Sequence, residues 1–501
     1  MKNERKAGIL LNVSSFPGKY GIGGFSCNVE NFLNEFAGMG FKIWQTLPIT
    51  SLGWGNSPYC GISAYAGNYL YIDLERLENG LLTREELASA EVKDAFYLTD
   101  YAAAARNKSR LLRLAYSRVS PDLAAKIKAF SDENADWLYD YAAFMVLKEV
   151  NNQSAWTTWD KKWRDHTDKT ALAVQKEYPE EFGYYLFEQY WFFVQWKRIL
   201  EYANGLGIEV FGDVPIYLSC DSVDVWADPK VFLLDKDYNP TEVAGVPPDY
   251  FSEDGQLWGN PLYDYKAMAK NNYAWWVRRI KHLHKLYNII RIDHFRGFAN
   301  YWSVPATAKT AKEGKWVKGP GKKLFDVLYK EIPDLKIIAE DLGIIDDDVI
   351  ELLEKTGIPG MRVIQFGFDG DKGNTHLPYN YKKSCVAYTA THDNDTTLGW
   401  LLSLDEDTRQ EVLRYVNCPP DYGWASGAGK CPATRAVIRT VMSSCADIAI
   451  VPMQDLCGYG SDTRMNTPGV ADGCWRYRTN YNALNDVDHS FVRSVITTYG
   501  R

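Results

Sequence analysis

The chain has 501 residues, of which 46% are hydrophobic and 24% charged, and its formal net charge is −8. This composition is ordinary for a globular protein that is long enough to bury a large core. The acidic balance argues against nucleic acid as a partner, because phosphate contacts need a clustered basic surface. The nine cysteines, an odd number without a C-x-x-C pair, indicate buried, reduced thiols rather than a disulfide framework or a zinc site. Since no apolar segment approaches the ~18 residues of a membrane span and no signal-peptide pattern is visible, we expect no membrane contact and a cytoplasmic location.

Eight short apolar runs follow one another along the chain, each ending in polar residues, and helical patterns separate most of them. Buried parallel strands have this apolar character on both faces. Strands are predicted at residues 8–13, 42–48, 208–215, 289–293, 336–341, 361–366, 386–391 and 448–453. Eight strands alternating with helices predict an α/β fold, a (β/α)8 barrel; an open doubly wound sheet is the alternative.

The stretch between the second and third predicted strands is too long for a single crossover connection. Its sequence has helical patterns throughout and includes a plausible capping box at Thr83–Glu86. We therefore expect a mainly helical subdomain over residues 75–205, inserted after a strand. Loops that follow barrel strands lie at the C-terminal face, so this insertion would cover the face where barrel enzymes hold their active sites. Its aromatic run at residues 184–191 is interpreted as packing.

The fourth predicted strand carries an arginine and an aspartate at alternate positions. Residues two apart share a strand face, so Arg291 and Asp293 should face the barrel axis while Ile290 and Ile292 face the helices. A guanidinium lowers the pKa of a neighbouring carboxyl, which would keep Asp293 ionised as a nucleophile requires. A purely structural ion pair explains this motif equally well.

Two further carboxylates follow predicted strands. Glu340 ends the fifth strand, and nearby carboxylates would raise its pKa, which suits a general acid. The alternative is a strand-end acid that caps the next helix, a role that suits Asp341. His392 and Asp393 follow the seventh strand, where a turn rich in Asn and Asp is the alternative. Carboxylates on one rim of a barrel favour glycoside chemistry, which needs two of them beside the cleaved bond. The sequence shows no competing chemistry, because Walker, dinucleotide, H-E-x-x-H and G-x-S-x-G motifs are absent.

Several longer strings of the sequence resemble one family. They are GNSPY at 55–59, GDVPIY at 212–217, DSVDVW at 221–226, VAGVPPDYF at 243–251, GQLWGNP at 255–261, the segments around Asp293, Glu340 and Asp393, PMQD at 452–455 and RMN at 464–466. In length and order these strings resemble the 4-α-glucanotransferases called amylomaltases or disproportionating enzymes, glycoside hydrolase family 77 of the α-amylase clan. The resemblance covers nearly the whole chain.

The resemblance implies a single catalytic barrel over residues 1–501 and assigns roles to individual residues. Asp293 corresponds to the nucleophile, Glu340 to the general acid and base, and Asp393, with Asp395 as the alternative, to a third carboxylate that stabilises the transition state. The residues implied around the substrate are Tyr59, Asp213, Arg291, His294, Asp369, His392 and Asn466. An inserted segment over 220–285 is implied to carry an acceptor-site loop, 247–255, with Tyr250 and Phe251 at its tip and Gln256 and Trp258 beside it.

The implied reaction transfers segments of 1,4-α-glucan to a new acceptor by retaining double displacement, with no cofactor and no metal. The expected partners are malto-oligosaccharides and soluble α-1,4-glucans. The calcium-binding Asn of amylases is missing, since Tyr217 and Leu218 stand where amylases have an Asn-His pair. The alternatives are a hydrolase that uses the same residues with water and a non-catalytic glucan-binding protein.

Overall fold

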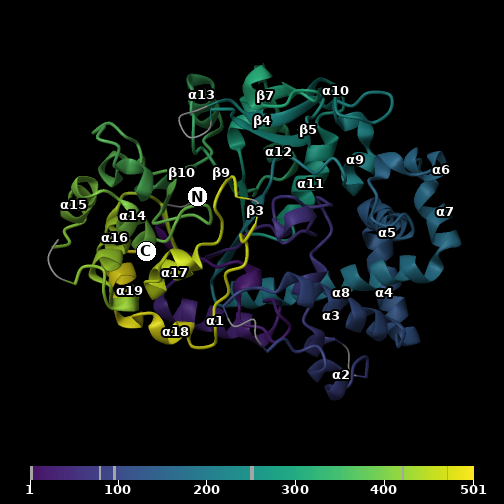
Figure 1. Ribbon diagram of the computed structural model, residues 1–501, viewed down its shortest axis with the longest axis horizontal. Coiled ribbons are helices and arrows are strands. Elements are labelled where there is room, and N and C mark those ends of the chain that lie inside the picture. Colours follow the sequence, from purple (N-terminus) through teal and green to yellow (C-terminus); the bar gives the residue numbers. More distant parts are fainter. Residues whose placement is uncertain (1–3, 78–79, 94–96, 249–252, 420–422, 471) are drawn as a thin grey trace.

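Eight parallel strands form the centre of the protein (Figure 1). The computed structural model describes residues 4–77, 80–93, 97–248, 253–419, 423–470 and 472–501. The strands of this sheet are β1 (Lys6–Leu10), β2 (Ile43–Gln45), β3 (Glu209–Val214), β6 (Ile289–Ile292), β9 (Ile337–Ala339), β10 (Gly360–Val363), β11 (Cys385–Tyr388) and β12 (Ile448–Pro452). Apart from β9 and β10, strands that follow one another in this set pair side by side, and β12 pairs back to β1. In a doubly wound sheet the order in which successive strands are added would reverse midway. The predicted barrel, with all eight strands, is therefore confirmed.

The ring closes between β9 and β10 without a regular ladder. The Ala339 N–H donates to the carbonyl of Pro359 at 2.9 Å. The Asp341 carboxylate then accepts the Met361 N–H at 2.5 Å and the Arg362 guanidinium at 2.8 Å. A side chain therefore adds to this main-chain hydrogen bond where a regular ladder is missing.

This position of Asp341 corrects its predicted role as a helix cap. Its side chain is buried against Gly360, where an added Cβ would lie 2.4 Å from a carboxylate oxygen, so only glycine fits. The next helix, α13 (Asp347–Thr356), is instead capped by Asp346, whose side chain accepts the Val349 N–H.

Helices occupy the segments between the strands and cover the barrel. The first, α1 (Cys27–Met39), begins where the Ser26 hydroxyl accepts the Asn28 N–H and ends at Gly40, which has the positive φ of 101° that favours glycine. The other helices after β3 are α9 (Val223–Ala227), α10 (Tyr265–Lys270), α11 (Ala274–His284), α12 (Lys322–Glu331), α13, α14 (Thr397–Ser403), α15 (Glu406–Tyr415), α16 (Pro432–Ser443), α17 (Met453–Cys457), α18 (Ala483–Asp486) and α19 (His489–Thr498).

The segment between β2 and β3 is mainly helical, as predicted, and much of it lies to one side of the barrel (Figure 1). Its helices are α2 (Arg84–Ala88), α3 (Tyr101–Tyr116), α4 (Pro121–Glu133), α5 (Ala135–Val150), α6 (Lys161–Arg164), α7 (Thr170–Glu177) and α8 (Pro179–Gly205). The capping box is present, with Thr83 and Glu86 each accepting the other's N–H. The aromatic run is buried, which confirms packing: Tyr184 is 2% and Phe187 0% exposed. Helix α8 contacts α5 and also β3, so it joins this segment to the barrel.

A second sheet was not predicted. It is antiparallel, in the order β5-β4-β7-β8, from β4 (Glu242–Val246), β5 (Gln256–Pro261), β7 (Asn300–Pro305) and β8 (Lys315–Lys318). Strands β4 and β5 form a hairpin whose connection is the predicted loop 247–255. Because β4 also pairs with β7, this structural unit extends past the predicted end at residue 285.

The cysteines form no disulfide, and all nine lie among the described residues. Cys27, Cys60 and Cys445 are exposed, so the expectation of buried thiols is wrong for these three. Among the described helices, none combines the length and apolar character needed to cross a membrane.

Candidate active site

A cleft of about 670 Å³ lies at the carboxyl ends of the barrel strands. It is lined by residues that directly follow β6, β9 and β10 and by the segment after β11. The predicted residues among them are Trp258, Arg291, Asp293, His294, Glu340 and Asp393. The strand ends thus bring together the three carboxylates that the sequence singled out.

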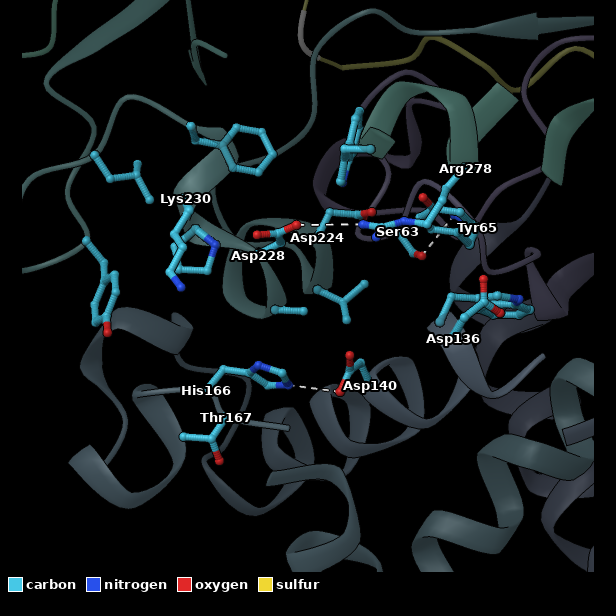
Figure 2. A pocket seen from close by; sticks show the side chains of 18 of the residues that line it. Ser63, Tyr65, Asp136, Asp140, His166, Thr167, Asp224, Asp228, Lys230 and Arg278 are labelled. Carbon is cyan, nitrogen blue, oxygen red and sulfur yellow. Dashed lines mark hydrogen bonds and ion pairs between the residues drawn. The ribbon is translucent and has the colours of Figure 1, made fainter. Parts of the chain in front are cut away.

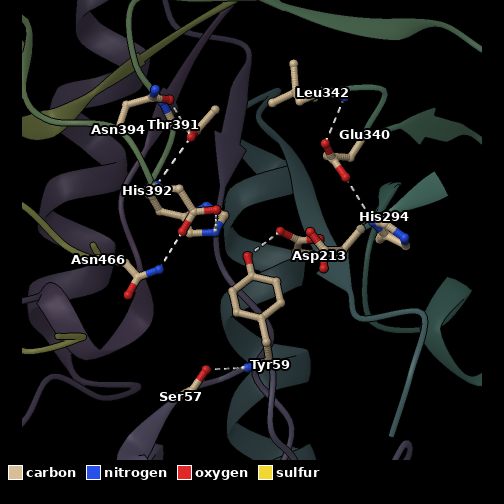
Figure 3. Close-up of polar contacts among 12 residues, drawn as sticks. Ser57, Tyr59, Asp213, His294, Glu340, Leu342, Thr391, His392, Asn394 and Asn466 are labelled. Atoms are coloured by element: carbon tan, nitrogen blue, oxygen red, sulfur yellow. Dashed lines mark hydrogen bonds and ion pairs between the residues drawn. The ribbon is translucent and has the colours of Figure 1, made fainter. Parts of the chain in front are cut away.

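Arg291 holds two carboxylates at the bottom of this cleft. Its guanidinium contacts Asp213 of β3 at 2.5 Å and Asp293 at 3.0 Å, and its Nε contacts the Met361 sulfur on β10 at 3.4 Å. These contacts reach across the barrel, which confirms that Arg291 faces the axis. The Tyr59 hydroxyl donates to the same Asp213 at 2.7 Å (Figure 3). Asp213 is 2% exposed, so it acts on the cleft through Arg291.

The pKa of Asp293 departs from the expectation. Burial raises it well above its usual range, Arg291 opposes that rise, and the neighbouring carboxylates Asp213 and Glu340 add to it. The guanidinium therefore acts in the predicted direction, but burial outweighs it. The prediction of a lowered pKa for Asp293 is therefore wrong.

Glu340 directly follows β9, on the strand next to β6. Its carboxylate accepts the backbone N–H of His294 at 2.7 Å and that of Leu342 at 2.9 Å (Figure 3). His294 reaches it with a positive φ of 51°, a conformation that costs a non-glycine residue about 1–2 kcal/mol. Burial raises the pKa of Glu340, while Arg291 and the two N–H groups oppose the rise. The raised pKa was predicted, although burial rather than neighbouring carboxylates is its main cause.

The third carboxylate, Asp393, is held from two sides. Asn466 donates to one oxygen at 2.6 Å, and the His392 imidazole lies 3.3 Å from the other (Figure 3). The Arg464 guanidinium donates to the Asp393 carbonyl at 2.7 Å. Asp395, the alternative for the third carboxylate, accepts the Ser461 hydroxyl and the Thr396 N–H. It also lines the cleft.

A buried aspartate supports this loop from behind. Asp455, 1% exposed, accepts the hydroxyl of Thr389 at 2.5 Å and both the N–H and the hydroxyl of Thr397 at 2.7 Å. Thr389 and Thr397 bracket the segment that carries His392 and Asp393. One carboxylate therefore fixes both ends of the loop.

A tryptophan from the antiparallel sheet borders the cleft. Trp258 is 37% exposed, packs edge-on against the His294 ring at a centroid distance of 4.8 Å, and donates to the Gln256 side chain at 3.1 Å. Burial lowers the pKa of His294 to about 3, so this ring is neutral at pH 7. Tyr59 stacks on the His392 ring at 5.1 Å, on the other side of the site.

Two groups of predicted residues are not brought into the site. Asp369 lies on an exposed turn after β10, where it accepts the Asp371 N–H and the Asn374 amide, and it does not line the cleft. Tyr250 and Phe251, the predicted tip of the acceptor loop, lie outside the described residues.

Comparison with known proteins gives the family. A family model described as 4-alpha-glucanotransferase, of glycoside hydrolase family 77, matches residues 11–484. The chain belongs to this family.

Individual relatives of the 4-alpha-glucanotransferase family match the chain over nearly its full length. The 4-alpha-glucanotransferase of Clostridium butyricum is 41% identical over 494 residues, which cover 98% of this chain and 100% of that protein. That of Thermus thermophilus is 39% identical over 485 residues, 95% of both chains. The structure of amylomaltase from Streptococcus agalactiae in complex with acarbose superposes with a TM-score of 0.93 at 35% identity, covering 99% of this chain and 100% of that one.

Other residues that line the cleft were assigned no role from the sequence, although some of them lie in the strings shared with the 4-alpha-glucanotransferase family. They are Leu342, Gly343, Gln365, Phe366, Thr391, Asn394, Trp400, Ser403, Arg464 and Pro468. Gln365 and Phe366 lie just after β10. Residues that follow a barrel strand lie at its C-terminal face, which is how Asp293 and Glu340 were located, so these two could have been found in the same way. Trp400 and Ser403 on α14 carried no such signal, because their position depends on how that helix packs.

Proposed function

We propose that this protein is a 4-α-glucanotransferase that moves segments of 1,4-α-D-glucan to the 4-position of glucose or of another 1,4-α-glucan. The observation that carries the proposal is the placement of Asp293 and Glu340 at the ends of adjacent strands, facing one cleft, with Asp393 beside them. Two carboxylates that flank a glycosidic bond are what double displacement requires. Membership of the family and the acarbose complex of the related amylomaltase support malto-oligosaccharides as substrates.

In the first step, Glu340 protonates the glycosidic oxygen while the Asp293 carboxylate attacks the anomeric carbon. The bond to the leaving sugar breaks, that sugar departs with the proton, and a covalent glucosyl–Asp293 ester forms. The two N–H groups on Glu340 stabilise the carboxylate that it becomes once its proton has left. We expect the two carboxyl groups to lie ~5–5.5 Å apart, the spacing of retaining enzymes.

In the second step, Glu340 removes the proton from the 4-hydroxyl of an acceptor sugar. The acceptor oxygen attacks the anomeric carbon, the ester breaks, and Asp293 and the protonated Glu340 are restored. Asp393, which Asn466 and His392 hold in place, accepts hydrogen bonds from the sugar hydroxyls and stabilises the positive charge of the transition state.

The protonation pattern follows from the coupling of the two carboxyls. Ionising one of them raises the pKa of the other, so they lose their protons in two separate steps. Between these steps the pair holds one proton and one negative charge. The proposed first step needs the charge on Asp293 and the proton on Glu340. The 3.0 Å contact with Arg291 favours this arrangement, whereas the two N–H groups on Glu340 oppose it.

Transfer rather than hydrolysis requires that an acceptor sugar outcompetes water at ~55 M. Trp258 offers an exposed aromatic face at the rim of the cleft, on which an acceptor ring could stack. The hairpin loop 247–255, with Tyr250 and Phe251, is proposed to act with it, by holding the acceptor and by excluding water until it arrives.

The proposal is tested with maltotriose as sole substrate and separation of the products. A ladder of longer chains together with glucose is expected. Shorter sugars alone would identify a hydrolase, and unchanged maltotriose would leave only glucan binding.

The residue roles are tested with two variants. Asp293→Asn should lower turnover on the order of 10⁴-fold or more while the melting temperature stays near that of the wild type. Glu340→Gln should block cleavage of maltotriose yet still react with an α-maltosyl fluoride, whose leaving group needs no acid. Peptide mapping should then find the sugar on Asp293; an adduct on another residue would overturn the assignment.

A further inference from the structure

A second cavity, of about 700 Å³, lies apart from the catalytic cleft (Figure 2). It is formed where α5 and residues 166–168 of the helical segment face residues 223–238, which include α9. Residues 63–65 and the start of α11 complete its wall. None of its lining residues lines the catalytic cleft. Its volume falls within the ~300–1,000 Å³ of small-molecule sites, which occur preferentially where two structural units meet.

Hydrogen-bond acceptors dominate its polar lining. Six aspartates face it: Asp136, Asp140, Asp168, Asp224, Asp228 and Asp235. Asp224 is only 6% exposed, and one of its oxygens accepts the Ala64 N–H at 2.8 Å. Burial raises the pKa of Asp224 to about 6 and also raises that of Asp228. A carboxyl as buried as that of Asp224 normally has hydrogen-bond partners, whereas the Asp228 side chain is 40% exposed and lies 3.6 Å from the Arg278 guanidinium.

Hydrogen-bond donors are interspersed among these acceptors. The His166 imidazole contacts Asp140 at 2.9 Å, and Figure 2 shows both at the edge of the hollow. The Ser63 hydroxyl accepts two backbone N–H groups, which leaves its own proton for a ligand. Lys230 and Arg278 supply the two cationic side chains of the lining.

Aromatic rings make up the rest of the wall. Tyr65 and Trp137 lie parallel, with a centroid distance of 6.2 Å and an interplanar angle of 14°. Phe232 packs edge-on against Trp275. Trp275 is 3% exposed. The wall therefore offers apolar ring surface beside the polar groups of the cavity.

These features narrow the class of ligand. Six aspartates against one lysine and one arginine disfavour phosphates and nucleotides. Among the described residues no three acidic, His or Cys side chains are placed to hold a metal ion. Interleaved donors and acceptors beside aromatic faces match a ring that carries hydroxyls on its edge and C–H groups on its faces.

We propose that this cavity binds an uncharged hexose ring, a glucose unit of a malto-oligosaccharide, at a site separate from the cleft. The hexose class rests on the lining alone, whereas the choice of glucose rests on the proposed function. The hydroxyls donate to Asp140 and Asp228, the Ser63 hydroxyl donates to the ring, and Trp137 packs against its face.

The test measures how much maltotriose the full chain binds when it cannot turn the sugar over. In an Asp293→Asn background, equilibrium dialysis should find one maltotriose more per chain than the cleft alone accounts for. Adding Asp140→Ala and Asp228→Ala should weaken that additional site on the order of tenfold or more, since each change removes hydrogen bonds to a charged group. Asp237→Ala, an exposed aspartate outside the cavity, is the matched control and should leave both sites unchanged.

Hydrogen exchange locates the additional site. Maltotriose should slow exchange in α5 and in residues 223–238 of the Asp293→Asn protein, and this protection should vanish in the variant that also lacks Asp140 and Asp228. A single maltotriose per chain, or protection that survives both substitutions, would overturn the proposal.

Three other ligands separate this proposal from the proposed function. If free glucose slows exchange around the cavity but maltotriose does not, the cavity binds a hexose, and the proposal that it binds a unit of a malto-oligosaccharide is wrong. Inorganic phosphate or spermidine bound at the cavity in place of sugar would refute the hexose assignment. Loss of maltotriose disproportionation by the wild type bears on the cleft alone, because these binding measurements need no turnover.

Discussion

Glu188 lies within the aromatic core of α8 and is expected to make stability depend on pH. It is 3% exposed, accepts the Tyr184 hydroxyl at 3.1 Å and lies 3.4 Å from the Gln189 amide, and among the described residues no cation forms an ion pair with it. Burial raises its pKa from 4.5 to about 7. A folded-state pKa above the unfolded value means that the native state binds the proton more tightly, so stability is lost as pH rises through 7.

The size of the effect follows from this shift. A difference of about 2.5 pH units corresponds to about 3 kcal/mol, at 1.36 kcal/mol per unit. The full amount is present below the unfolded pKa of 4.5 and lost above pH 8. With an unfolding entropy of about 2.1 cal/mol/K for each of 501 residues, 3 kcal/mol corresponds to about 3 °C in melting temperature.

Glu188→Gln tests this reasoning, because glutamine keeps the shape of the protonated acid and cannot ionise. Melting curves at pH 5.5 and pH 8 should differ less for the variant, which should melt about 3 °C higher than the wild type at pH 8. Glu201→Gln, an exposed position on the same helix, serves as control and should change neither curve. If Glu188→Gln melts at the wild-type temperature at pH 8, the buried carboxylate carries no such cost.

Two further predictions concern the support of the third carboxylate. Asn466→Ala removes the 2.6 Å hydrogen bond to Asp393. The variant should lower kcat/KM for maltotriose on the order of tenfold with no change in melting temperature. Unchanged kinetics would show that Asp393 is positioned without Asn466. Asp455→Ala leaves the polar groups of Thr389 and Thr397 without their acceptor, so it should lower both the melting temperature and kcat. A wild-type kcat at 25 °C would mean that the loop carrying His392 and Asp393 keeps its shape without Asp455.

The sequence was informative where chemistry coincides with the end of an apolar strand. Asp293, Glu340 and Asp393 could be placed on one rim because a parallel barrel aligns its strand ends. Net pKa values could not be predicted, because the pattern around Arg291 reveals a neighbouring charge but not how deeply Asp293 is buried. The antiparallel sheet was missed because β5 and β8 are largely exposed and their few apolar residues do not alternate with polar ones. The second cavity was also invisible, since α5 and residues 223–238 meet only in the folded chain.

The seam between β9 and β10 gives the two reacting carboxylates unequal mechanical support. Asp293 follows β6, which forms regular ladders with β3 and with β9. Glu340 follows β9, which has such a ladder on one side and is joined to β10 on the other chiefly through the Asp341 side chain. A nucleophile must hold one position through both displacements, while an acid and base must follow first a departing and then an arriving oxygen. The strand that is paired on both sides thus carries the group that has to stay still, and the strand at the seam carries the group that has to follow the oxygens.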